Sequence, residues 1–300
     1  MGPFSHLVAA KKAWPAVAEA NGLNLDSAQA GLVGAYYAGA LAPDAGYYTD
    51  TYGPLADLAH LIKPWQFIAA LWQEAATPQE KAFALGWLSH ALVDVEGHAN
   101  LVNPAMGGGY SLNPLRHKQI EWGLDCLLLM QDEHAWLWTV AIDKTAGLGL
   151  WQRAMLKAYA KAVDGKILQD AMAAEVKEIG RLPYVWWLSG RLTRPGRFWG
   201  NALGRLAGVS LRPLYVQYLT WRDAEMDIRA VLTPAQPGDR DIKAWERVLK
   251  DLPGSMASFA WQGGPPRPSL NADPACPPET CLAGQKALAW LAGQGPGKIE

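Results

Sequence analysis

The segment GWLSHALVDVEGHANLVNP, residues 86–104, restricts the possible fold more than any other part of the sequence. It is largely apolar, yet His90, Asp94 and His98 recur in it at intervals of four residues. Residues four apart in an α-helix lie about 40° apart around its axis, so these three side chains share one face. The segment therefore predicts a helix that carries a polar ladder into an apolar core.

A clear start signal precedes this helix. In TPQE, residues 77–80, Thr77 can cap a helix, Pro78 suits the first helical position and Glu80 completes a capping box. We therefore expect one helix from this point to about residue 98.

Helical patterns recur along the rest of the chain, whereas strand patterns are scarce. The first expected helix covers residues 5–20, with Ser5 as its N-cap and Pro15 as a point where it bends or breaks. Further helices are expected at 27–41, 54–61, 65–75, 114–132, 136–145, 148–165, 167–180, 241–251 and 280–292. The predicted fold class is all-α, a multi-helix bundle around a polynuclear metal site.

Composition is consistent with one main domain. The chain has 300 residues, of which 50% are hydrophobic and 18% charged, so a substantial core can form. Residues 1–255 are expected to form an all-α domain, with every candidate metal ligand in residues 1–125. Residues 256–300 contain a Pro- and Gly-rich connector and an expected C-terminal helix.

Several partner classes are disfavoured. The formal net charge of −1 provides no electrostatic reason to expect a nucleic-acid partner. No uninterrupted apolar run of about 18 residues occurs, so no transmembrane segment is expected. MGPFSHLVAAKKAW, at the N-terminus, lacks the pattern of a signal peptide. We expect a cytoplasmic protein if Met1 is the native start, and a secreted or periplasmic one if a signal peptide was removed upstream.

The cysteines do not form a zinc-binding pattern. Cys126 lies in an apolar helical pattern and is expected to be a buried thiol. Cys276 and Cys281 flank a Pro-rich turn and could form a disulfide in an exported protein, which the sequence leaves open.

A second pair of metal-capable side chains follows the ladder. His117 and Glu121 are four residues apart on the next expected helix, and they face the ladder if the two helices pack antiparallel. His6, Asp44 and His60 lie upstream. Imidazole and carboxylate donors without thiolates suit zinc, and a carboxylate in the middle of the ladder can bridge two ions.

A single buried histidine is usually a hydrogen-bonded core residue, so the alternative without metal has to be weighed. Burying five histidines and three carboxylates without metal would leave polar groups unpaired at about 1–3 kcal/mol each. Structural zinc contributes about 10–16 kcal/mol. A di-iron carboxylate site would need Glu-x-x-His pairs, which the sequence lacks. We therefore predict a polynuclear site of two to three Zn²⁺ ions.

The order of these motifs resembles the zinc-dependent phospholipase C family, which includes the catalytic domain of glycosylphosphatidylinositol-specific phospholipase D. The single-strand-specific zinc nucleases are similar more distantly. The resemblance covers roughly residues 1–130. Its motifs, in chain order, are His6, GAYYAGALAPDAGYY at 34–48, His60, GWLSHALVDVEGHA at 86–99 and HKQIEWGLD at 117–125.

The resemblance implies an all-α fold around three zinc ions. The implied ligands of the first ion are Asp44, His60, His90 and Asp94. Those of the second are His6, Asp94 and the amino and carbonyl groups of Met1. Those of the third are His98, His117 and Glu121. Asp94 would bridge the first two ions. Asp44 is also the implied catalytic residue, which orients or deprotonates the attacking water.

Three features distinguish this chain from some members of the family that it resembles. Three residues separate Asp94 from His98, as in the phospholipase D-type members, whereas secreted bacterial phospholipases C and the nucleases have five. Position 1 is Met, where the family's terminal ligand is a mature Trp or Cys. The acid of the second pair is Glu121, as in the phospholipases, where the nucleases use Asp.

Asp125 lies one turn after Glu121 and allows two interpretations. It could orient a metal ligand from the second shell, or it could be a solvated helix residue. Asp50 and Asp57 are expected to be turn and cap residues rather than ligands.

Multinuclear zinc suits phosphodiester hydrolysis, because zinc lowers the pKa of bound water towards ~7 and stabilises charge on phosphate. We expect a zinc-dependent phosphodiester hydrolase, most simply a phospholipase with type C-like cleavage of a head group by zinc-bound hydroxide. The alternatives are a phospholipase D-type or single-strand nuclease-type phosphodiesterase, and a non-catalytic lipid- or protein-binding scaffold with a structural zinc cluster. The Trp- and Arg-containing segment 184–222 could contact a membrane surface or simply pack in the core.

Overall fold

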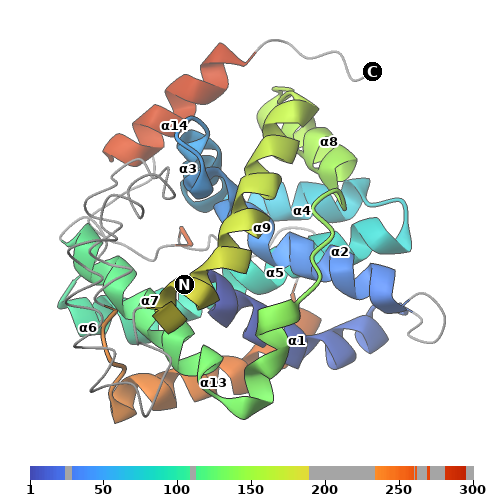
Figure 1. Cartoon of the computed structure of the whole chain (residues 1–300). Helices are drawn as coiled ribbons and strands as arrows, with labels where there is room; N and C mark the ends of the chain where they lie inside the picture. The colour runs from blue at the N-terminus through green and yellow to red at the C-terminus, as the bar shows by residue number, and fades with distance from the viewer. Residues whose placement is uncertain are drawn as a thin grey trace.

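The computed structural model describes residues 1–23, 29–108, 113–188, 234–259, 261, 269–270 and 281–294. The regular elements within these ranges are all helical, which confirms the predicted all-α class (Figure 1). They are α1 (Pro3–Ala20), α2 (Gln29–Leu41), η1 (Ala42–Tyr48), α3 (Gly53–Leu61), α4 (Pro64–Glu74), α5 (Pro78–Gly97), η2 (His98–Val102), α6 (Asn103–Met106), α7 (Pro114–Leu129), η4 (Asp132–Thr139), α8 (Leu148–Tyr159), α9 (Gly165–Leu188), α13 (Asp239–Ala257) and α14 (Leu282–Gly293). In this part of the chain, no helix combines the length and apolar character needed to span a bilayer.

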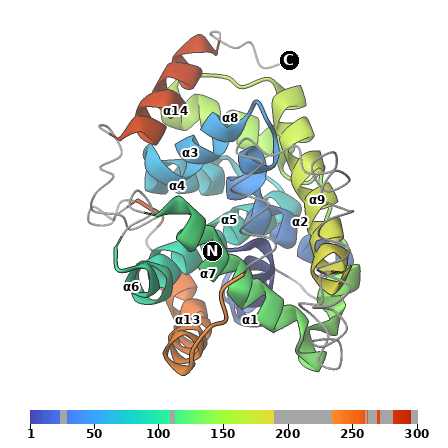
Figure 2. The same ribbon diagram turned by 60° about the vertical axis from the view of Figure 1, so that its left-hand side comes forward.

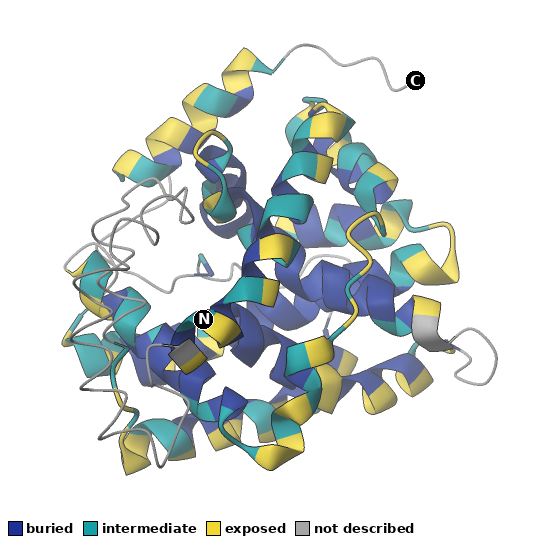
Figure 3. Ribbon diagram, viewed as in Figure 1, coloured by how far each residue is buried: buried dark blue, intermediate teal, exposed yellow. Residues whose placement is uncertain are grey.

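Helix α5 is the centre of the bundle. It packs most extensively against α2 and also contacts α1, α4 and α13. Every residue from Ala82 to Asp94 is buried, and α2 and α5 form the dark centre of Figure 3. A helix that is apolar all round belongs inside a protein, so burial explains why α5 carries no polar face other than its ladder.

The ends of α5 follow the sequence prediction. The backbone N–H of Glu80 donates to Thr77 Oγ1 at 3.2 Å, and Glu80 Oε2 accepts from the N–H groups of Ala76 and Thr77, which completes the capping box. At the other end the chain continues from α5 into the π-helical turn η2, which begins at His98. Such turns occur mostly as short insertions, frequently at functional sites.

The start of α1 corrects the expectation that Ser5 is its N-cap. The helix begins at Pro3 with Gly2 in the cap position, and the Ser5 hydroxyl inside the first turn donates to the Gly2 carbonyl at 2.7 Å. The N–H groups of Phe4 and Ser5 donate to the carboxylate of Asp125 on α7. The cap thus comes from a distant side chain, which no local pattern signals. The helix also continues unbroken past Pro15.

Other boundaries differ by a few residues. The segment expected as a helix at 136–145 is instead the 3₁₀ helix η4, which ends at Thr139. Helix α9 runs on to Leu188. Of the Trp- and Arg-containing segment 184–222, residues 189–222 lie outside the described residues, and the described end of α9 exposes Tyr184 and Trp187.

The C-terminal helices pack on opposite sides of the bundle (Figures 1 and 2). Helix α13 contacts α1 and α5, whereas α14 contacts α3. The expected division near residue 255 stays a prediction. Cys126 is buried as a thiol and Cys281 is disulfide-bonded, while Cys276 lies outside the described residues.

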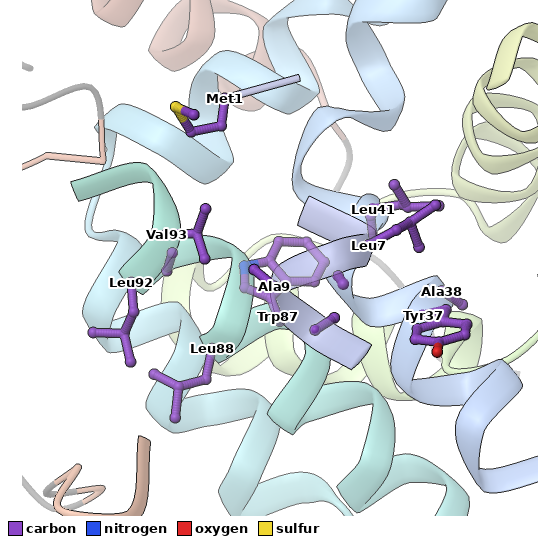
Figure 4. Packing of buried hydrophobic residues seen from close by; sticks show 14 of the residues in the cluster. Met1, Leu7, Ala9, Tyr37, Ala38, Leu41, Trp87, Leu88, Leu92 and Val93 are labelled. Carbon is purple, nitrogen blue, oxygen red and sulfur yellow. The ribbon is translucent and has the colours of Figure 1, made fainter. Parts of the chain in front are cut away.

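The first residue of the chain belongs to the core. Met1 is 5% exposed and lies in the same buried hydrophobic cluster as Trp87, Leu88 and Leu92 (Figure 4). Its sulfur sits over Gly97, where an added Cβ would come within 2.6 Å of Sδ. The amino group of Met1 is thereby held at the end of α5.

The closest approach between α2 and α5 depends on two glycines. A Cβ at Gly39 would overlap the carbonyl oxygen of Phe83, and a Cβ at Gly86 would overlap that of Tyr36. Because backbone atoms form both contacts, only a shift of one helix could make room.

We predict that Gly39→Ala lowers the free energy of unfolding by about 1–3 kcal/mol, the usual cost of overpacking. Gly31→Ala, on the same helix with open space around its Cβ, should raise it by about 0.4–1 kcal/mol. Urea denaturation of both variants measures the difference. Equal effects would show that the close approach is not tight.

Candidate metal centre

The structure brings the sequence-predicted ligands together around the C-terminal end of α5. Five helical elements besides α5 contribute, namely α1, η1, α3, η2 and α7. The donor residues are Met1, His6, Asp44, His60, His90, Asp94, His98, His117 and Glu121. Within the described part of the chain, metal-capable groups form the sets His6–Asp44–His90, His60–His90–Asp94 and His98–His117–Glu121.

Asp44, His60 and His90 surround one oxygen of Asp94, and these four residues are called the Asp94 group below. Asp94 Oδ2 lies 3.2 Å from His60 Nε2 and 3.3 Å from His90 Nε2, and these two nitrogens are 3.3 Å apart. Asp44 Oδ1 lies 3.2 Å from His60 Nε2 and 4.0 Å from His90 Nε2. Four donor groups therefore converge on one small volume.

The other ring nitrogens show which atoms face that volume. His60 Nδ1 lies 2.8 Å from the carbonyl oxygen of Ala56, and His90 Nδ1 lies 2.8 Å from that of Ala40. A carbonyl only accepts, so each Nδ1 carries a hydrogen, and in the neutral ring Nε2 presents a lone pair. Lone pairs and carboxylate oxygens at this spacing repel one another unless a cation lies among them.

The spacing fits zinc. Tetrahedral zinc with bonds of about 2.0–2.1 Å holds its ligand atoms about 3.3–3.4 Å apart. The His60, His90 and Asp94 atoms are already 3.2–3.3 Å apart. The backbone carbonyls that orient the two rings are the kind of outer partner that metal-bound histidines use.

The set His98–His117–Glu121 lies between η2 and α7. His98 Nε2 is 3.3 Å from His117 Nε2, and Glu121 Oε1 is 3.1 Å from the first and 2.8 Å from the second. His98 Nδ1 lies 3.2 Å from the carbonyl oxygen of Leu270, whose own N–H donates to the carbonyl of His60. Leu270 thus links His98 to His60 of the Asp94 group, from a position 172 residues beyond His98.

The N-terminus lies between Asp94 and Glu121. The Met1 amino group is 2.6 Å from Asp94 Oδ1 and 2.9 Å from Glu121 Oε1. His6 Nε2 is 3.2 Å from the same Asp94 oxygen, and His6 Nδ1 is buried without a hydrogen-bond partner among the described residues. Each oxygen of Asp94 therefore faces a different group of donors, which is the arrangement that a bridging carboxylate needs.

Protons supply the positive charge of the metal-free site. Burial lowers the pKa of the Met1 amine, but the charges of Asp94, Glu121 and Asp44 outweigh it and raise that pKa to about 11. Burial also opposes protonation of His60, whose hydrogen bonds to Asp44 and Asp94 nevertheless raise its pKa to about 10. Metal binding has to displace these protons, because amine and imidazole coordinate in their deprotonated forms.

Asp125 fixes the position of the N-terminal segment at the site. The side chain is fully buried, which excludes the solvated alternative for it. Burial raises its pKa to about 7, against its hydrogen bonds from the N–H groups of Phe4 and Ser5. The carboxylate also fills the space beside Gly2, where an added Cβ would overlap it. Asp125 therefore holds the turn that places Met1 and His6.

A cleft of about 170 Å³ adjoins the donors. Asp44, Asp94 and Glu121 reach it, together with Tyr47, Tyr48, Asp57, Lys118 and Trp122, and Ala283 of α14. Asp44 is 14% exposed, whereas Asp94 is 2% exposed. Asp44 is therefore the more accessible of the two carboxylates beside His60.

Two residues near the site escaped sequence reasoning. Leu270 comes from a segment with no recognisable link to the motifs. Glu175 is fully buried on α9, and a signal for it does exist: it continues the apolar stripe of Leu168, Met172 and Ile179. An acid in such a stripe marks a buried ionisable group.

The contact between Gly2 and Asp125 can be tested by a double-mutant cycle. We predict that Gly2→Ala destabilises the protein by about 1–3 kcal/mol because the new methyl group overlaps the carboxylate. In an Asp125→Ala background, where the obstacle is gone, the cost should largely disappear. Thermal melting of the four proteins gives the coupling. An unchanged cost in the second background would remove Asp125 as the cause.

Comparison with known proteins identifies the family. The family model for zinc-dependent phospholipase C matches residues 5–179, more than half of the chain, and includes every histidine and carboxylate of the three sets. Neither a search of curated proteins nor a search of solved structures finds a match. The motif resemblance is thus confirmed over a longer range than the motifs themselves cover, and this chain belongs to the zinc-dependent phospholipase C family.

Proposed function

We propose that the chain is a zinc-dependent phosphodiester hydrolase that cleaves a phospholipid head group in a type C-like manner. The family supports zinc-dependent phospholipase activity in general. The observation that carries the finer proposal is the position of Asp44, which touches both the His60–His90 donors and the cleft. A structural cluster would not need a carboxylate that reaches solvent.

The proposed ligand groups are those that the motif resemblance implies, and the short distances among several of their members support them. We propose that one ion is held by Asp44, His60, His90 and Asp94. A second ion is held by His6, Asp94 and the amino and carbonyl groups of Met1. A third is held by His98, His117 and Glu121. Bound zinc would supply positive charge to the phosphate and acidify a coordinated water. Asp125 would not touch an ion, but would hold the first turn of α1 and thereby position Met1 and His6.

Asp44 is proposed to take the proton of the attacking water. Burial raises its pKa, but His90 and His60 outweigh burial and lower it, so the carboxylate is ionised and can accept a proton. Its hydrogen bond to His60 keeps the carboxylate oriented. Asp94 is less suited to this role because it is nearly inaccessible.

The rest of the cleft suits an amphipathic phosphodiester. Lys118 contributes a positive charge near the place of an anionic phosphate, while Tyr47, Tyr48 and Trp122 provide aromatic surface. Tyr184 and Trp187, 57% and 52% exposed at the end of α9, are the described part of the segment proposed to contact a membrane surface.

We predict that purified protein contains two to three zinc ions and hydrolyses bis-p-nitrophenyl phosphate. Phosphatidylcholine vesicles should yield diacylglycerol. Phosphatidic acid would instead indicate type D cleavage, and cleavage of single-stranded DNA would indicate a nuclease. Zinc without turnover of any diester would favour the structural scaffold. Elemental analysis and product chromatography measure these outcomes.

Asp44→Asn should lower kcat about 10²–10⁴-fold, the usual contribution of a positioned base, while most of the zinc remains bound. The matched control is Asp50→Asn, which removes an exposed carboxylate from the neighbouring loop and should leave both values unchanged. Steady-state kinetics and zinc content are measured together. Full activity in Asp44→Asn would remove this residue from the reaction.

A further inference from the structure

Leu270 lies beyond residues 5–179, the range that the family model matches, yet its backbone contacts the metal centre twice. The N–H of Leu270 donates to the carbonyl oxygen of His60 at 3.1 Å. The carbonyl oxygen of Leu270 lies 3.2 Å from His98 Nδ1. One residue from the C-terminal part of the chain therefore touches two histidines that are proposed to bind different zinc ions.

The bond to His60 satisfies a carbonyl group at the end of α3. The last four carbonyls of an α-helix have no partner within the helix, and His60 is followed in α3 by Leu61 alone. The residue four positions after His60 is Pro64, and proline has no N–H to donate. The side chain of Leu270 is fully buried in the hydrophobic cluster. Leu270 is therefore anchored twice, by its N–H and by its side chain.

The contact to His98 fixes the direction in which the imidazole ring faces. A carbonyl oxygen only accepts, so Nδ1 carries the hydrogen and Nε2 keeps its lone pair for an ion. Nε2 lies 3.3 Å from His117 Nε2 and 3.1 Å from Glu121 Oε1. A second acceptor, Asp94 Oδ1, lies 3.8 Å from Nδ1. If the Leu270 carbonyl moved away, the ring would turn towards that oxygen and away from His117 and Glu121.

This orienting carbonyl is less firmly held than those of the other two oriented histidines. The carbonyls of Ala56 and Ala40, which orient His60 and His90, lie inside the helices α3 and α2. Helical hydrogen bonds and helix packing keep them in place. Leu270 lies in a turn, so its two anchors have to fix its carbonyl. A loss of packing at the Leu270 side chain would therefore displace this carbonyl.

The C-terminal segment, described at residues 269–270 and 281–294, also reaches the cleft. Helix α14 packs against α3, and Ala283 near its start is among the residues that line the cleft. Leu270 and α14 thus both contact α3, the element that carries His60. The segment therefore borders both the proposed ligands and the space proposed for substrate.

We propose that Leu270 is a positioning residue of the metal centre, whose backbone holds His98 towards His117 and Glu121. The inference rests on the proposed zinc centre. It predicts a selective effect, because the histidines of the Asp94 group are oriented by helical carbonyls instead. Disturbing Leu270 should weaken the ion proposed at His98, His117 and Glu121, and it should spare the ion of the Asp94 group. A general loss of stability would not distinguish the two.

Leu270→Ala keeps the backbone and removes most of the side-chain anchor. One zinc ion should bind about 10–100-fold more weakly, the usual effect of losing an outer partner, while the remaining zinc binds as in wild type. Leu270→Met keeps the side-chain volume and should restore wild-type binding. Leu270→Val, a smaller truncation, should weaken the same ion to a lesser extent. Competition with a chromophoric chelator, started from metal-free protein, measures zinc stoichiometry and affinity.

Leu150→Ala is the matched control. Leu150 is as completely buried as Leu270, but it lies on α8, which carries none of the proposed ligands. Both alanine variants leave a cavity and should lower the melting temperature of metal-free protein. Leu150→Ala should leave zinc binding unchanged. Wild-type affinity for every ion in Leu270→Ala and Leu270→Val would overturn the proposal, as would the same loss of zinc in both alanine variants. Wild-type protein that binds no zinc would instead contradict the zinc centre itself.

Discussion

The site depends on the burial of Asp94 at the end of an apolar helix. One oxygen faces His60 and His90, and the other faces the Met1 amine and His6. An ionised carboxylate in this position is tolerated only because cationic groups surround it. Burial raises its pKa, yet the N-terminal ammonium and His90 hold the pKa well below the ordinary value. Protons occupy this cationic role in the metal-free protein, and zinc can take it over.

Side chains around Asp94 have to be packed precisely if the charged groups are to surround its carboxylate. Donor atoms 3.2–3.3 Å apart can be held only by side chains with fixed rotamers. Helix α5 provides this by burial on every side, and its closest neighbour α2 approaches through Gly39 and Gly86. Backbone carbonyls of Ala40 and Ala56 orient His90 and His60. The same core that stabilises the fold therefore sets the geometry of the donors.

Helical periodicity encodes part of the site in the sequence. The ladder from His90 to His98 and the pair His117–Glu121 follow directly from a spacing of four. Local patterns do not report contacts between distant segments. The Asp125 cap on α1 displaced the expected cap at Ser5, and Leu270 reaches His98 from a segment 172 residues away. Neither contact could be predicted, because each depends on how whole helices pack rather than on neighbours in the chain.

Glu175 breaks the apolar pattern of α9, since it is fully buried and has no hydrogen-bond partner among the described residues. An acid in an apolar stripe conflicts with the pattern around it, and such conflicts concentrate at functional sites. Stability alone would favour an apolar residue there, because a buried carboxyl group without a hydrogen-bond partner is costly. The cluster of histidines and carboxylates at the end of α5 has a similar cost, since these buried polar groups weaken a metal-free core. The fold is therefore best understood as a helical bundle whose centre is most stable when cations complete it.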